Sequence, residues 1–180
     1  MDPKKTTALL GIAFIVFLAL SYFENLFFFG LLGEFLRNPF VAVATLFVHN
    51  LLVVSLILLG MTFYVRLVVL DFFKREKYGH IVLEHPRPFA VTFTVMILLL
   101  SIVRSSILLY GRFSLEDLPT MLLISMPIGI IEGYGMYLTI SKTLGRTMST
   151  KDLVFIYCIF FIAAIIEVGF INLLVTVTAT

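Results

Sequence analysis

The chain of 180 residues is 61% hydrophobic and only 13% charged, with a formal net charge of +2. Soluble domains are about half apolar and about a quarter charged, so this composition excludes an ordinary soluble domain. It indicates one integral domain in a lipid bilayer, and we expect a multi-pass protein of the cell membrane. The small net charge gives no reason to expect nucleic acid as a partner.

Five apolar runs predict an all-α bundle of transmembrane helices in a single domain, residues 1–180. A helix that crosses a bilayer needs about 20 mostly apolar residues, and each run approaches or exceeds that length. The predicted spans are residues 6–23, 40–70, 89–110, 119–144 and 153–177.

The first run also resembles a signal peptide. Lys4 and Lys5 precede its apolar core, and Ala19-Leu20-Ser21 fits a cleavage site. We expect a retained signal anchor. The segment from Glu24 to Arg37 that follows is aromatic and too short to span, so it predicts an interfacial or re-entrant helix ended by Asn38-Pro39.

The basic residues predict the topology. If the N-terminus lies in the cytoplasm, nine basic residues lie on the cytoplasmic side of the membrane, and only Arg37 and Arg112 lie on the external side. The nine are Lys4, Lys5, Lys74, Arg75, Lys77, Arg87, Lys142, Arg146 and Lys151. This asymmetry follows the positive-inside rule, and five spans then place the C-terminus outside.

Four of the predicted spans carry polar side chains at a similar depth. With a rise of about 1.5 Å per residue, these side chains lie about 18 to 24 Å above the cytoplasmic face. They are His49, Asn50, Arg104, Glu132 and Glu167. Ionisable groups at such a depth are costly and usually mark the interior of a bundle or a functional site.

The sequences around the two glutamates are alike. Glu132 lies in IIEGYG and Glu167 in IIEVGF, and both stretches contain small residues that let helices approach closely. Gly129 and Gly133 form a G-x-x-x-G spacing beside Glu132. Pro127 removes one hydrogen bond of the helix and predicts a kink there. We therefore expect both carboxylates to face the interior of the bundle.

Two interpretations of this polar layer stay open. In the structural one, Arg104 pairs with one glutamate, and Asn50 or His49 forms a hydrogen bond with the other. In the functional one, the carboxylates exceed Arg104 by one charge and bind a cation or a proton. His49 alone favours a hydrogen-bonded core histidine over a metal ligand, and Arg104 could also extend toward the membrane surface.

Three segments carry a family resemblance. They are FVHNLLVVSLILLG (residues 47–60), MPIGIIEGYGMYLTIS (residues 126–141) and FIAAIIEVGFINLL (residues 161–174). In these segments the chain resembles the stage II sporulation protein M family. The resemblance implies an α-helical membrane protein of a family widespread in prokaryotes, acting with partner proteins and without established enzymatic chemistry.

The resemblance carries over only part of the family pattern. It covers Asn50, Pro127, Gly129, Glu132 and Glu167. The histidine that the family has between its proline and glycine is Ile128 here, and the proline that often follows the last acidic residue is absent. No role of that histidine can therefore be transferred to this chain.

The functional expectation is a channel or transporter for a cation, a proton or a small solute. The alternative is a non-catalytic membrane scaffold that assembles with partner proteins. The chain has no glycine-rich phosphate loop, no H-E-x-x-H and no cysteine cluster, so we expect neither an enzyme nor a cofactor. Gly129, Gly133 and Gly135 predict close helix packing in a homo-oligomer, with a dimer as the expected form.

Overall fold

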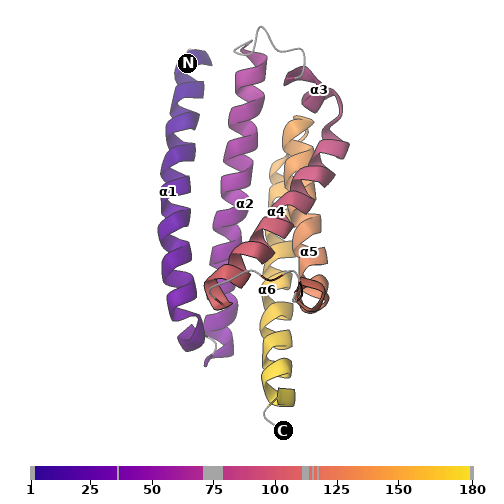
Figure 1. Cartoon of the computed structure of the whole chain (residues 1–180). Helices are drawn as coiled ribbons and strands as arrows, with labels where there is room; N and C mark the ends of the chain where they lie inside the picture. Colours follow the sequence, from indigo (N-terminus) through magenta and orange to yellow (C-terminus); the bar gives the residue numbers. More distant parts are fainter. Residues whose placement is uncertain are drawn as a thin grey trace.

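The computed structural model describes residues 3–35, 37–70, 79–110, 114, 116 and 118–178, and for some of these, including Arg104, only the backbone. The described part of the chain forms six helices and no strand, which confirms the all-α fold class (Figure 1). The helices are α1 (Pro3–Phe35), α2 (Pro39–Val69), α3 (Gly79–Glu84), α4 (Pro86–Tyr110), α5 (Leu118–Leu144) and α6 (Thr150–Thr178).

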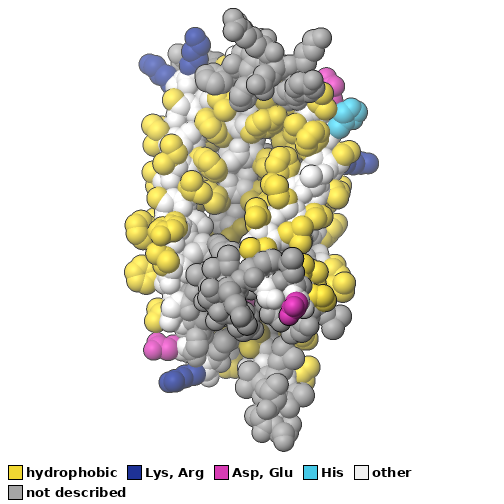
Figure 2. Space-filling model, in the orientation of Figure 1, with side chains coloured by type: hydrophobic (Ala, Val, Ile, Leu, Met, Phe, Trp, Pro, Cys, Tyr) yellow, Lys and Arg dark blue, Asp and Glu magenta, His cyan; other side chains and the backbone are white. Residues whose placement is uncertain are grey.

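Four of these helices contain a stretch long and apolar enough to cross a membrane. The stretches are Lys4–Phe28, Pro39–Val69, Pro86–Val103 and Thr150–Leu173. Figure 2 shows hydrophobic side chains over the middle of the visible face, with Lys and Arg side chains toward its two ends. This distribution is the one expected of a protein with an apolar belt in a bilayer.

The first helix differs from the prediction. α1 continues without a break through Glu24 to Phe35, so the predicted end at residue 23 and the separate interfacial or re-entrant helix are wrong. The physical reason is local, because the residues after Glu24 are apolar and compatible with a helix. The chain turns only at Asn38, whose side chain accepts hydrogen bonds from the N–H groups of Phe40 and Val41 at the start of α2.

The long helices run alongside one another in alternating directions, with α4 crossing obliquely (Figure 1). The described residues begin and end at opposite ends of the bundle. α2 is central, because it packs against α1, α5 and α6, while α4 packs against α5.

The core consists of three apolar clusters along the bundle. The first contains Phe28, Ala42, Leu46, Ala164 and Val168. The second contains Val54, Met136, Ile156 and Phe160, and the third Val65, Ala90, Ile140 and Leu144. Asn50 lies on α2 one turn from Leu46 and one turn from Val54, so it is placed between the first two clusters.

Glycines bring α1 and α2 into close contact in a reciprocal way. A Cβ atom added at Gly11 would lie 3.0 Å from Cε2 of Phe63, and one added at Gly60 would lie 2.9 Å from Cε2 of Phe14. The two phenylalanine rings are also stacked, with centroids 6.4 Å apart. Each helix therefore supplies a glycine that receives an aromatic ring of the other, which fixes their register.

The turn between α5 and α6 is specified locally. The N–H group of Gly145 donates to the carbonyl oxygen of Ser141, and Arg146 adopts a φ of 55°. α6 then begins with a capping box, in which Ser149 and Asp152 accept hydrogen bonds from each other's backbone N–H groups. Such a tight connection holds α5 and α6 side by side, and with them Glu132 and Glu167.

Candidate polar site inside the helix bundle

α2 supplies two adjacent polar side chains, His49 and Asn50. Consecutive residues of an α-helix point about 100° apart, so the two side chains face different neighbours. His49 contacts Glu24 on α1, and Asn50 contacts Glu132 on α5. The central helix therefore joins two carboxylates that come from opposite sides of the bundle.

The contact between Asn50 and Glu132 is a short hydrogen bond. Nδ2 of Asn50 donates to Oε1 of Glu132 over 2.7 Å, and Asn50 is buried. The amide stabilises one carboxylate oxygen, but it carries no charge. Asn50 therefore positions Glu132 without neutralising it.

Glu167 brings a second carboxylate to the same region from α6. It lies close enough to Glu132 for direct charge repulsion between the two side chains. On α6 it is flanked by Ala163, Ala164 and Val168, all of which are buried and apolar. No hydrogen bond or ion pair links the Glu167 carboxylate to another of the described side chains.

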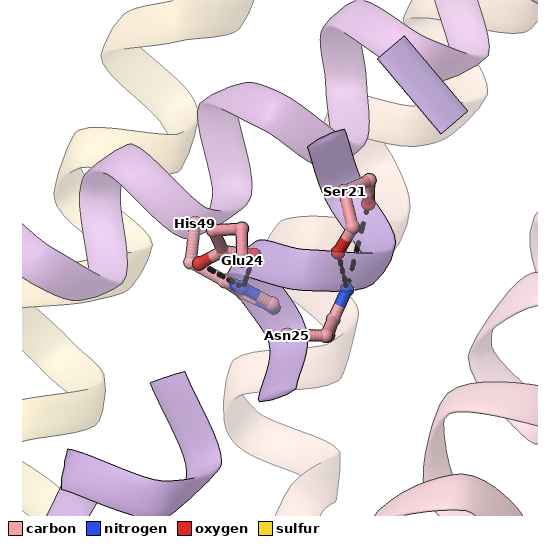
Figure 3. A network of polar contacts seen from close by, with 4 residues as sticks. All are labelled: Ser21, Glu24, Asn25 and His49. Carbon is pink, nitrogen blue, oxygen red and sulfur yellow. Dashed lines mark hydrogen bonds and ion pairs between the residues drawn. The ribbon is translucent and has the colours of Figure 1, made fainter. Parts of the chain in front are cut away.

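Glu24 and His49 form a hydrogen-bonded pair between α1 and α2 (Figure 3). Both carboxylate oxygens of Glu24 lie 3.0 Å from Nδ1 of His49. Only 12% of the His49 side chain and 22% of the Glu24 side chain are exposed. The imidazole stacks on Phe28, with ring centroids 4.4 Å apart. The ring is thus held on one edge by a carboxylate and on one face by an aromatic side chain.

Two buried polar atoms near these carboxylates have no hydrogen-bond partner among the described residues. One is Oδ1 of Asn25, whose Nδ2 donates to the carbonyl oxygen of Ser21 over 2.6 Å beside Glu24 (Figure 3). The other is the hydroxyl oxygen of Thr94 on α4. The methyl group of Thr94 lies 3.7 Å from the position of a Cβ at Gly133, next to Glu132. Buried polar groups normally have a partner, so both places suit water or a ligand atom.

The remaining predicted site residues take different positions. α5 continues through Pro127, so the proline removes a hydrogen bond without ending the helix. Gly133 faces Leu98 of α4, whereas Gly129 has no atom within 4 Å of its Cβ position. Arg104 belongs to α4, and its side chain lies outside the described part of the chain, as does the predicted pairing with a glutamate.

Glu24 is the residue of this layer that sequence reasoning missed. The sequence predicts a short helix at the membrane surface here, because a span of about 20 residues ends just before Glu24. The available signal was the apolar run that continues on both sides of Glu24. Read as one helix, that run places Glu24 at the depth of His49.

The fold and the site thus define a bundle of membrane-length helices with an internal layer of carboxylates. No family model, curated protein or solved structure matches the chain. The resemblance to the stage II sporulation protein M family therefore remains a prediction from the three quoted segments.

Proposed function

We propose that the chain is a multi-pass protein of the cell membrane that binds and moves a small cation or a proton through this layer. The observation that carries the proposal is the juxtaposition of Glu132 and Glu167. Their only hydrogen-bond partner among the described side chains is the neutral amide of Asn50. A carboxylate pair with so little compensation favours a function over a purely structural role.

Two carboxylates that share a site poor in water repel each other strongly, and both stay ionised only with a positive partner. In a structural layer that partner is a fixed Lys or Arg side chain. Here no salt bridge to Glu132 or Glu167 exists within the described residues. We propose that the positive partner is a mobile cation or a proton, and a mobile partner is one that can be transported.

The arrangement of basic residues supports the predicted orientation. Helix ends at one end of the bundle carry most of the described basic residues, namely Lys4, Lys5, Arg87, Lys142, Arg146 and Lys151. Arg37 lies at the other end, in the turn between α1 and α2. The first end is therefore proposed to face the cytoplasm, with α5 as a fifth span.

Ion flux into vesicles tests this function. The purified protein is reconstituted into liposomes, and the fluxes of H⁺, Na⁺ and K⁺ are measured under an imposed gradient. Glu132→Gln and Glu167→Gln are each expected to lower the flux of the transported ion at least about 10-fold, because each removes a charge that attracts it. Glu34→Gln is the control, since Glu34 is exposed near the end of α1, and its flux is expected to match the wild type. Absence of any ion flux in the wild type would contradict the proposal.

A second candidate, a scaffold that assembles through copies of itself, is favoured by one observation. Gly129 and Gly169 have nothing within 4 Å of their Cβ positions, so a second helix could approach there. Gly169 also lines a groove of about 590 Å³ between α2 and α6. Gly133 and Gly135 instead face Leu98 and Phe160 of the same chain and do not support this candidate.

The mass of the protein in nanodiscs tests the scaffold. If a second copy of the chain binds at Gly129 and Gly169, the protein is a dimer, and Gly129→Leu or Gly169→Leu is expected to convert it to a monomer. A wild-type monomer, or a dimer that survives both substitutions, would contradict it.

A further inference from the structure

We propose that the Glu24–His49 pair is a proton-accepting site and that the ion handled by the polar layer is the proton. This inference rests on the proposed ion movement and names the species moved. Its basis is the geometry of the pair, which is separate from the geometry of Glu132 and Glu167.

The pair defines which nitrogen of His49 accepts a proton. An ionised carboxylate only accepts hydrogen bonds, so the Nδ1 atom held 3.0 Å from both Glu24 oxygens carries the hydrogen. In a neutral imidazole the other nitrogen, Nε2, then keeps the lone pair. No hydrogen bond from a described residue occupies Nε2.

The charge balance favours a proton at this site. With a neutral ring, the pair carries one negative charge between two apolar helices. One proton forms an N–H bond at Nε2 and converts the pair into an imidazolium and a carboxylate, with no net charge. Loss of the same proton breaks only that N–H bond and restores the neutral ring. The pair can therefore load and release a proton without any other covalent change.

The same donor set is poor for a metal ion. Metal sites in proteins combine several ligands in a defined geometry. The described residues contain no group of three or more His, Cys, Asp or Glu side chains that could hold a metal ion. Near Glu132 the described partner is Nδ2 of Asn50, a hydrogen-bond donor that is not a cation ligand. A proton needs only one lone pair, which Nε2 of His49 and each carboxylate offer.

The pair is connected to the other carboxylates of the layer through α2. Glu24 faces it from α1, and the adjacent Asn50 binds Glu132 of α5, which in turn lies near Glu167 of α6. On α4, Arg104 is the charged residue of the layer, and its side chain is not described. Thr94 of α4 has a buried hydroxyl oxygen without a hydrogen-bond partner among the described residues. The proton-binding groups of the layer thus come from α1, α2, α5 and α6.

The test is proton flux into vesicles that contain a trapped pH-sensitive dye, with K⁺ and valinomycin setting the membrane potential. His49→Gln is expected to lower proton flux at least about 10-fold, because glutamine has no lone pair of comparable basicity. Glu24→Gln is expected to lower it less, since the amide oxygen still accepts from Nδ1. His85→Gln is the matched control, because His85 is exposed before α4, and its flux is expected to equal that of the wild type.

A second measurement does not depend on transport. In nanodiscs, ¹⁵N NMR of the histidine rings is expected to show His49 with its hydrogen on Nδ1, and Glu24→Gln is expected to weaken that preference. A neutral His49 ring with its hydrogen on Nε2 and none on Nδ1 in the wild type would overturn the inference even if His49→Gln did not fold.

The outcomes separate this inference from the function on which it rests. Flux of Na⁺ or K⁺ without flux of protons would overturn the inference and leave the proposed function standing. Wild-type proton flux in a folded His49→Gln variant would overturn the role of the pair. No flux of any ion would overturn both.

Discussion

At Asn50 a single side chain connects the central helix to a carboxylate of α5. The amide is buried, and its 2.7 Å hydrogen bond reaches Oε1 of Glu132. Removing one partner of such a bond leaves a buried acceptor without compensation, which usually costs more than removing both partners. The contribution of Asn50 is therefore best measured against the loss of Glu132 itself.

We predict that Asn50→Leu destabilises the protein by about 1–3 kcal/mol, because the Glu132 carboxyl group stays inside the bundle and loses its donor. The double variant Asn50→Leu/Glu132→Leu should be clearly more stable than Asn50→Leu alone. Unfolding in a detergent titration measures both. Asn172→Leu is the control, since Asn172 is exposed on α6, and it should change stability by no more than about 0.5 kcal/mol. A double variant less stable than the single one would contradict the argument.

At the scale of the helices, the glycines of α5 have unequal roles. A Cβ at Gly135 would lie 2.6 Å from Cε2 of Phe160, and Phe160 is itself fully buried in the core. Gly129, on the same helix, has open space beside it. Gly135 is thus a place where a side chain of α6 packs closely against α5, and Gly129 is the natural comparison.

We predict that Gly135→Ala destabilises the protein by about 1–3 kcal/mol, because the added methyl group overlaps a ring that cannot move aside. Gly129→Ala should leave stability unchanged or raise it by up to about 1 kcal/mol, because alanine favours the helix and meets no neighbour. Thermal unfolding of the two variants in the same detergent compares them directly. Equal effects of the two substitutions would show that α5 and α6 do not pack as described.

The helices also show which features a sequence can predict. The bounds of α2 and α5 follow from apolar runs that end at Pro, Gly or charged residues, so the sequence predicts them to within a residue. The C-terminal bound of α1 does not follow in this way, because a carboxylate inside an apolar run predicts the end of a span. The carboxylate of Glu24 is tolerated there because it contacts His49, and the contact between Glu24 and His49 depends on how α1 packs against α2. Pairing across helices is a tertiary property, which periodicity and composition do not contain.

The polar layer was predictable only in part for the same reason. Helical rise places Asn50, Glu132 and Glu167 at one depth, but it does not say which pairs form. The sequence left open whether Asn50 or His49 forms a hydrogen bond with a glutamate of the layer. In the structure Asn50 donates to Glu132, and His49 contacts Glu24 instead of Glu132 or Glu167.

At the scale of the whole molecule, the ends of the bundle differ in charge, and we predict an N-terminus in the cytoplasm and a C-terminus outside. Cysteine labelling of intact cells measures this in a Cys158→Ser background, since Cys158 is the single cysteine and is exposed. Arg37→Cys, between α1 and α2, should react from outside. Thr147→Cys, between α5 and α6, should react only after permeabilisation. The reverse pattern would invert the topology and remove the positive-inside argument.

The contact between Glu24 and His49 also bears on how the protein is made. The ribosome releases α1 and α2 before any other helix, so an acidic residue and its partner leave the ribosome within one hairpin. An unpaired acidic side chain at the centre of a membrane helix costs about 2.5–3.5 kcal/mol during insertion. Asn50 has a later partner, since Glu132 belongs to α5. During synthesis the Asn50 amide is therefore the group that lies in the bilayer without its partner. An unpaired neutral amide costs much less free energy there than an unpaired charge.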